Sequence, residues 1–139
     1  MIELLSNRAI EDAAIEWVMS LERAAGRQPR DVRYARHAGD IESPPRTIEV
    51  KAIGKSARGA DLPLELPQLA AARENPNFYV YVVDNIRQGA SERFQLRVLG
   101  GQRLQRLLLR VKEQRYYTLP WPVADYDSCP VGLATDGGG

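Results

Sequence analysis

The sequence has little of several residue types, and each scarcity narrows the functions it can have. It contains a single cysteine, Cys129, and a single histidine, His37, in 139 residues. One cysteine excludes a disulfide scaffold and a four-cysteine zinc site, and one histidine excludes motifs with two histidines on one helix. No apolar run approaches the roughly 20 residues of a membrane span, and no charged-then-apolar signal opens the chain. We therefore expect a cytoplasmic protein with no membrane partner.

Length and charge set the next limits. We expect a single domain over residues 1–133 and a flexible C-terminal tail at 134–139. The net charge of +1 is the sum of −2 over residues 1–86, +6 over 87–115 and −3 over 116–139. A polyanion responds to the local field rather than to the total charge, so near-neutrality does not exclude nucleic acid as a partner. The small net charge indicates a modest affinity for nucleic acid.

Apolar periodicity predicts alternating helices and strands. The clearest helix covers residues 7–25, with Ser6 or Asn7 as its N-cap, and the clearest buried strand is Phe78–Val83. The pattern predicts an α/β fold with a mixed sheet flanked by helices. The other expected elements are a weak strand at 31–34, strands at 39–43, 46–53 and 93–99, helices at 67–73 and around 104–111, and an extended segment at 116–123.

The tryptophans and tyrosines are expected mainly in core or edge packing. Stacking of Tyr116 and Tyr117 on nucleic-acid bases is the alternative that we keep for that pair.

The most informative pattern is Asp40, eight further residues, and then Glu49-Val50-Lys51. Alternation along a strand puts Glu49 and Lys51 on one face, about 7 Å apart. If residues 39–43 pair with that strand, Asp40 lies beside them. Two carboxylates at the ends of adjacent strands make a hard oxygen site suited to Mg²⁺ or Mn²⁺, and a nearby lysine can stabilise developing negative charge. A plainer interpretation is a solvated strand face with a weak Glu–Lys pair.

These residues also carry a resemblance. The spacing from Asp40 to Glu49 and Lys51 resembles the PD-(D/E)XK nuclease pattern. The segments Asp40–Ser43 and Arg46–Lys51 are similar, more narrowly, to the domain at the C-terminus of the plant protein NO VEIN, which also occurs in bacterial restriction- and helicase-associated proteins. Two departures are Gly39 directly before Asp40, where the family usually has one residue between, and Ala52 in place of the usual glycine.

The resemblance implies a restriction-endonuclease-like core of helix, three strands, helix and strand. It implies that Asp40, Glu49 and Lys51 are catalytic and that Asp40 and Glu49 hold a metal. It adds Glu11 as a third carboxylate, although by itself Glu11 is a first-turn partner of the helix dipole. Glu16 takes that role if the helix register differs, and Gln68 is the candidate for a polar side chain facing the site.

Basic residues outside this pattern are candidate contacts to a nucleic-acid backbone. Lys55 and Arg58 follow the strand that carries Lys51, and phosphate contacts there would add affinity without sequence choice. Three further arginines share one helical stripe, which is either a wet face or a site for an anionic partner: Arg103, Arg106 and Arg110.

Together these patterns predict a Mg²⁺- or Mn²⁺-dependent nuclease domain that hydrolyses DNA, in restriction, defence or repair. The alternatives are the same fold with weak or no catalysis, binding DNA or a partner protein, and a small interaction domain in which Glu49 and Lys51 pair incidentally. The expected partners are DNA and either a second copy or a larger restriction- or helicase-type protein.

Overall fold

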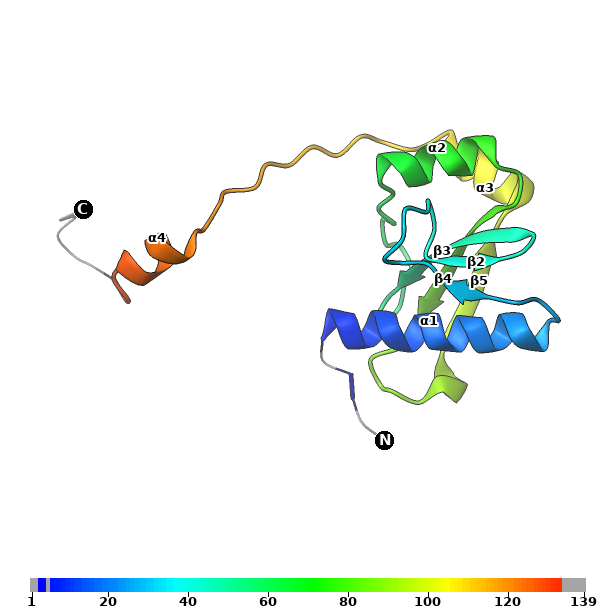
Figure 1. The fold of residues 1–139 in the computed structure, drawn as a ribbon, viewed down its shortest axis with the longest axis horizontal. Helices are drawn as coiled ribbons and strands as arrows, with labels where there is room; N and C mark the ends of the chain where they lie inside the picture. Colours follow the sequence, from blue (N-terminus) through cyan, green and yellow to red (C-terminus); the bar gives the residue numbers. More distant parts are fainter. Residues whose placement is uncertain (1–2, 5, 134–139) are drawn as a thin grey trace.

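The computed structural model describes residues 3–4 and 6–133 as one α/β domain followed by an extended C-terminal segment (Figure 1). The expected order of helices and strands is confirmed, and α4 is an addition that the sequence pattern did not predict. No helix within the described residues is long and apolar enough to cross a membrane. The elements are α1 (Asn7–Ala24), β1 (Arg30–Asp31), β2 (Ile41–Ser43), β3 (Arg46–Ala52), α2 (Leu66–Glu74), β4 (Phe78–Asp84), a 3₁₀ turn η1 (Ser91–Arg93), β5 (Gln95–Leu99), α3 (Gly101–Leu108) and α4 (Val123–Ser128).

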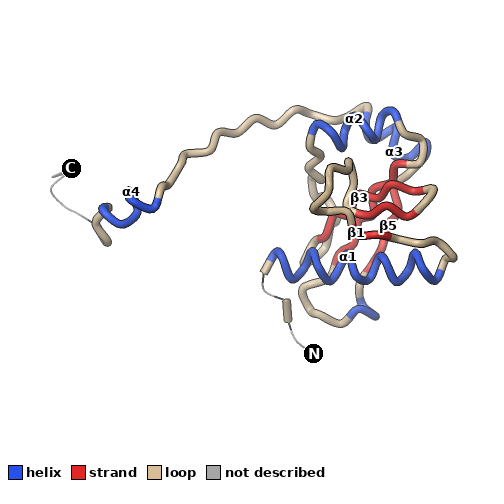
Figure 2. The backbone as a smooth tube through the Cα atoms, in the orientation of Figure 1, coloured by secondary structure: helices blue, strands red, loops and turns tan. Residues whose placement is uncertain are grey.

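The five strands form one mixed sheet in the order β1-β2-β3-β4-β5. Only β3 and β4 are parallel, and α2 makes the connection between them. Figure 2 shows α1 on one side of the sheet and α2 and α3 on the other. This layering follows from the alternation of β3: Ile48 and Val50 pack with α1, while Ile53 joins the cluster under α2 and α3.

Helix α1 begins and ends at defined capping residues. The Ser6 hydroxyl accepts a hydrogen bond from the Ala9 amide at 3.1 Å, so Ser6 is the N-cap. At the other end Gly26 has φ +88°, and the amides of Gly26 and Arg27 donate to the carbonyls of Arg23 and Glu22. This Schellman arrangement needs a left-handed residue, which glycine supplies without strain.

A buried carboxylate fixes the C-terminal end of α1 to the sheet. Glu22 is 3% exposed and accepts hydrogen bonds from the Arg27 guanidinium at 2.5 and 2.8 Å, the Ser43 hydroxyl at 3.0 Å and the Tyr81 hydroxyl at 3.0 Å. Burial alone would raise the pKa of Glu22, but these donors outweigh it and hold the pKa below its usual value. The network joins α1 to β2 and β4, because its donors come from both strands.

Several apolar residues are more exposed than their periodicity predicts. Val98 in β5 and Leu107 in α3 are each 43% exposed, whereas Leu104 and Leu108 are buried as expected. Trp17 packs edge-on against Phe94, and Tyr81 is buried, as expected for core aromatics. The expectation is wrong for Tyr34, which is 83% exposed. It is also wrong for the aromatics of the C-terminal segment, which lie at the surface: Tyr116, Tyr117, Trp121 and Tyr126. The predicted tail at 134–139 lies outside the described residues.

We predict that Glu22→Ala lowers the free energy of unfolding by about 3 kcal/mol, since it leaves the Ser43 and Tyr81 hydroxyls without their buried acceptor and Arg27 without its counter-charge. Urea denaturation followed by circular dichroism measures the change. Glu16→Ala, on an exposed position of the same helix, is the control and should change stability by less than about 0.5 kcal/mol. A loss below about 1 kcal/mol for Glu22→Ala would show that this network is not what fixes α1.

Candidate metal and nuclease site

The pairing of β2 with β3 brings Asp40 to the strand that carries Glu49 and Lys51. Ile41 pairs with Ile48, and the Asp40 amide donates to the Ile48 carbonyl at 2.8 Å, so Asp40 continues the antiparallel register opposite Glu49. The Asp40 Oδ2 atom accepts a hydrogen bond from the Val50 amide at 2.9 Å. The expected placement of Asp40 beside Glu49 and Lys51 is therefore confirmed, and its carboxylate is held by the backbone of β3.

Gly39 makes this close approach feasible. It is buried, and a Cβ atom added there would lie 2.7 Å from the Ile48 carbonyl oxygen, closer than real Cβ atoms come. The chain therefore needs a residue without a side chain directly before Asp40. This gives a physical reason for the first departure from the family pattern.

Glu49 and Lys51 form an ion pair that is largely removed from solvent. The Lys51 Nζ atom lies 2.9 Å from Glu49 Oε2, and the two side chains are 15% and 5% exposed. The other carboxylate oxygen, Glu49 Oε1, is buried and has no hydrogen-bond partner among the described residues. A charged oxygen left in that state is unfavourable, and such an atom is a natural position for a ligand or ion to bind.

The carboxyl groups of Asp40 and Glu49 both have raised pKa values in this site. Burial raises the pKa of Glu49 to about 7, and the neighbouring Asp40 carboxylate adds to that rise, while Lys51 opposes it. Burial likewise raises the pKa of Asp40, against the lowering effect of the Val50 amide, and the charge of Glu11 raises it further. The site therefore concentrates carboxylates, and Lys51 is the cation that the chain places in contact with Glu49.

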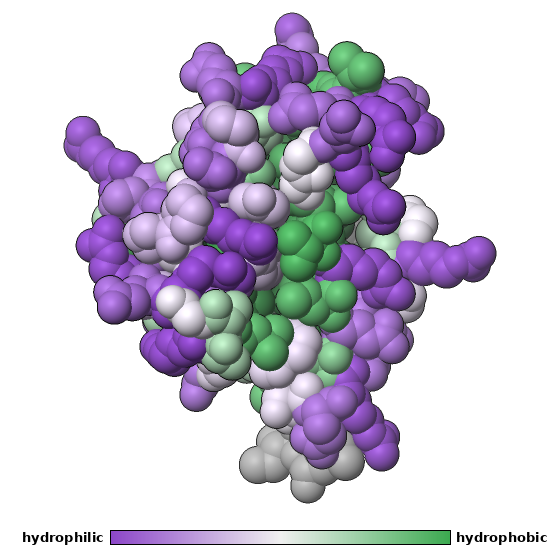
Figure 3. Space-filling model, turned by 90° about the vertical axis from the view of Figure 1, so that its right-hand side faces the viewer, coloured by the Kyte–Doolittle hydropathy of each residue, from purple (hydrophilic) through white to green (hydrophobic). Residues whose placement is uncertain are grey.

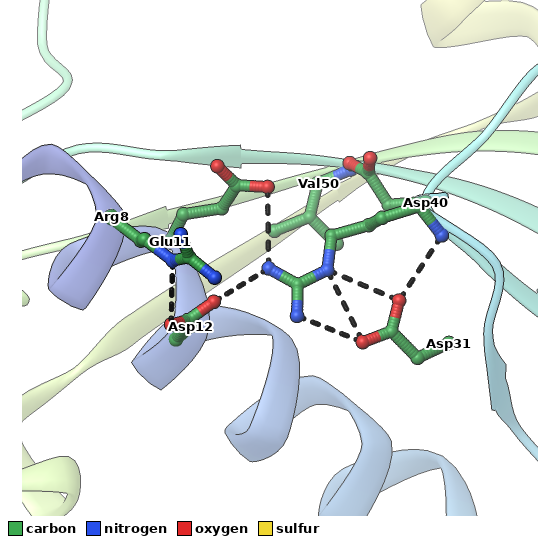
Figure 4. Close-up of polar contacts among 7 residues, drawn as sticks. Arg8, Glu11, Asp12, Asp31, Asp40 and Val50 are labelled. Carbon is green, nitrogen blue, oxygen red and sulfur yellow. Dashed lines mark hydrogen bonds and ion pairs between the residues drawn. The ribbon is translucent and has the colours of Figure 1, made fainter.

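Glu11 is held by an arginine that the sequence pattern did not single out. The Arg33 Nη1 atom contacts Asp12 at 2.8 Å and Glu11 at 3.4 Å, while Nε and Nη2 of the same guanidinium bind Asp31 (Figure 4). Its side chain is only 13% exposed, although it comes from an irregular segment. Figure 4 shows Glu11 and Asp12 projecting from α1 toward this guanidinium, with Asp40, the residue directly before β2, beside Val50.

Of the three acidic residues of the family pattern, two lie together and the third, Glu11, contacts Arg33 instead. Within residues 3–4 and 6–133, no three His, Cys, Asp or Glu side chains are grouped so as to hold a metal ion. Asp40 and Glu49 lie together, while Glu11 is half exposed and bound to Arg33. The role of Glu11 as a metal ligand stays a prediction, and Glu16, its substitute, is exposed on α1.

The remaining candidates occupy three places. Gln68 caps α2, because its Oε1 atom accepts a hydrogen bond from the Glu65 amide at 2.9 Å. Lys55 and Arg58 are exposed in the loop after β3. The arginine stripe is exposed along α3: Arg103, Arg106 and Arg110.

Asp84 is a further residue near the site that the sequence analysis did not select. It ends β4, is 5% exposed, and accepts a hydrogen bond from the Ala57 amide at 2.7 Å. Its position fixes the loop that carries Lys55 and Arg58 to the end of the sheet. An acidic residue directly after an unbroken apolar strand was the signal available in the sequence.

Comparison with protein families adds one finding. The model of the family described as protein NO VEIN, C-terminal, matches residues 10–97, which is more than half of the chain. The chain belongs to this family. Comparison with curated proteins and with solved structures gives no match. The matched region of this NO VEIN C-terminal domain runs from α1 into β5, so it contains Glu11, Asp40, Glu49 and Lys51 and leaves out α3 and everything after it.

We predict that the NO VEIN C-terminal domain loses stability relative to its Glu49→Gln variant as the pH rises from 5 to 8. In the folded state the pKa of Glu49 is about 7, above its ordinary value. Between those two values the unfolded chain releases a proton that the folded chain keeps, so unfolding becomes more favourable as pH rises. The difference should reach about 1–3 kcal/mol by urea denaturation in EDTA.

Glu74→Gln, at an exposed position in α2, is the control and should follow the wild type across the same pH range. If the difference between wild type and Glu49→Gln stays constant with pH, Glu49 is not buried in the way that the structure describes.

Proposed function

We propose that this domain is a metal-dependent nuclease that hydrolyses DNA phosphodiester bonds. The observation that carries the proposal is the juxtaposition of Asp40, a half-buried residue directly before β2, with Glu49, a buried residue of β3 that is ion-paired to Lys51. The sequence of elements, a helix, three strands, a helix and a strand, agrees with a restriction-endonuclease-like core.

Asp40 and Glu49 are the residues that would hold Mg²⁺ or Mn²⁺. Their chemistry fits, because these ions prefer carboxylate oxygens and because Glu49 Oε1 lacks a partner. The raised pKa values of both carboxyl groups also fit, since a dication stabilises the ionised forms. A bound ion of this kind polarises a phosphate group and activates water for attack on it.

Lys51 supplies the positive charge that phosphodiester hydrolysis requires. Its ammonium group is held in place by Glu49 and is only 15% exposed, so it is oriented before a substrate arrives. Preorganised charge in a poorly solvated site stabilises negative charge that develops in a transition state better than a mobile surface lysine does. We assign Lys51 as the catalytic cation.

Two groups of exposed basic residues would contact the DNA backbone. Lys55 and Arg58 lie in the loop that follows the Lys51 strand, and Asp84 fixes that loop beside the end of β4. The arginine stripe of α3 is the second group. Contacts of this kind position DNA and give affinity that falls steeply with salt.

One observation favours a second candidate function, a DNA-binding module with weak or no catalysis. Glu11 is engaged by Arg33, so the third carboxylate of the family pattern is not grouped with Asp40 and Glu49. A site with two carboxylates binds a dication less tightly than one with three.

We predict that the purified domain converts supercoiled plasmid to nicked or linear DNA in the presence of Mn²⁺, and that Lys51→Ala reduces this rate at least about a hundredfold. The loss follows because no other lysine or arginine contacts Glu49 within the described residues. Agarose gels read over time measure the rate. Lys112→Ala removes an exposed lysine distant in sequence from the site and is the matched control.

If neither the wild type nor Lys51→Ala cleaves the plasmid, the enzyme proposal is contradicted. A gel shift with duplex DNA then decides between the remaining alternatives. Binding that weakens steeply with salt supports the DNA-binding module, and absence of binding supports an interaction domain.

A further inference from the structure

The segment after α3 exposes an unusual amount of apolar surface. We define residues 112–133 as the arm. It leaves the end of α3 and runs away from the sheet to α4 (Figure 1). Eight of its large apolar side chains are at least 60% exposed: Tyr116, Tyr117, Leu119, Trp121, Val123, Tyr126, Val131 and Leu133. Soluble domains seldom leave so many aromatic groups in water, so the arm has the character of a binding segment.

The arm has a backbone that is free to pair. Residues 112–121 are extended and take part in no backbone hydrogen bond in the described structure. Pro120 and Pro122 lack an amide donor, which suits a strand added at the edge of a sheet and not one in its interior. Addition of an extended segment to an exposed edge is a common mode of recognition.

The sheet offers its longer edge at β5, which has five residues against two in β1 at the other edge. β5 pairs with β4 on one side, and no strand among the described residues pairs with its other side. Val98 in this strand and Leu107 in the following helix are both 43% exposed, which gives the edge an apolar component. Figure 3 shows one face of the domain, where a band of apolar side chains lies between hydrophilic ones.

Charge matches the arm to this edge. From Tyr116 onward the described part of the arm contains Asp125 and Asp127 and no basic residue. Exposed arginines lie in and directly beside β5 and α3: Arg93, Arg97, Arg103, Arg106 and Arg110. Arg97 also contacts Asp84 of its own chain at 3.8 Å. Opposite charges across an interface guide association and exclude wrong partners.

We propose that the arm of one copy of this chain lies along the outer edge of β5 and the arginines of α3 in a second copy, so that two copies form a dimer by reciprocal exchange of arms. The arm then occupies the arginine stripe that we assign to DNA, so the arm and DNA compete for these arginines. A second copy is the occupant because donor and acceptor are both present on each chain and because the arm points away from its own sheet. Two equivalent contacts then form about one twofold axis, as in most homodimers.

The test is a charge exchange read out as molar mass. Wild-type protein should behave as a dimer in size-exclusion chromatography with light scattering. The arm variant Asp125→Arg/Asp127→Arg should dissociate at a concentration at least about tenfold higher, because it brings like charges together. The face variant Arg103→Glu/Arg106→Glu should do the same. A mixture of the two variants should restore the dimer, since each arm then meets a face of opposite charge.

Arg36→Glu, in the exposed segment before β2, is the charge-loss control and should remain dimeric. A wild type that is monomeric at every concentration would overturn the proposal. The arm would then bind either its own domain or another protein. So would a dimer that both single exchanges leave intact. The readout is mass alone, so failure here is distinct from failure of the nuclease proposal.

Discussion

The antiparallel register between β2 and β3 is the constraint on which the candidate site depends. The Asp40 amide and the Ile48 carbonyl fix that register, and the Val50 amide then holds the Asp40 carboxylate beside Glu49. Because strand side chains alternate, a slip of one residue would move Glu49 and Lys51 to the α1 face and bring Ile48 and Val50 out of the core. The apolar packing of α1 therefore secures the geometry of the polar site on the other face.

The chain surrounds three sets of carboxylates with different partners. Glu22 is surrounded by donors, and Asp31 and its neighbours share the Arg33 guanidinium, so both groups are stabilised by the chain itself. The Asp40 carboxylate instead raises the pKa of Glu49, and Glu49 Oε1 has no hydrogen-bond partner among the described residues. Protein stability alone does not favour such an arrangement, and a function is the usual reason for it.

Local pattern was sufficient to predict much of this structure. The α1 helix, the alternation of β3 and the buried run of β4 all follow from the period of apolar residues. The hairpin spacing predicted Asp40 beside Glu49 because only a short turn separates their strands.

Long-range contacts were beyond the reach of the same reasoning. Arg33 belongs to the weak strand predicted at 31–34, but β1 ends at Asp31, and Arg33 reaches residues 21 and 22 positions earlier, which no local pattern indicates. Glu22 pairs with Tyr81 across 59 residues. The tyrosines and tryptophans were predicted mainly in core or edge packing, those of the arm included, because composition cannot tell an apolar core segment from an apolar binding segment.

The central claim is that Asp40 and Glu49 together form one site for a divalent cation. Calorimetric titration of the purified chain with Mn²⁺ tests it most directly, using wild type, Asp40→Asn, Glu49→Gln and the control Glu42→Gln, whose carboxylate contacts Thr47 instead. The account predicts one site in wild type and in Glu42→Gln, and its loss in both of the other variants. Binding that persists in Asp40→Asn and Glu49→Gln, or no binding in any of the four proteins, would contradict it.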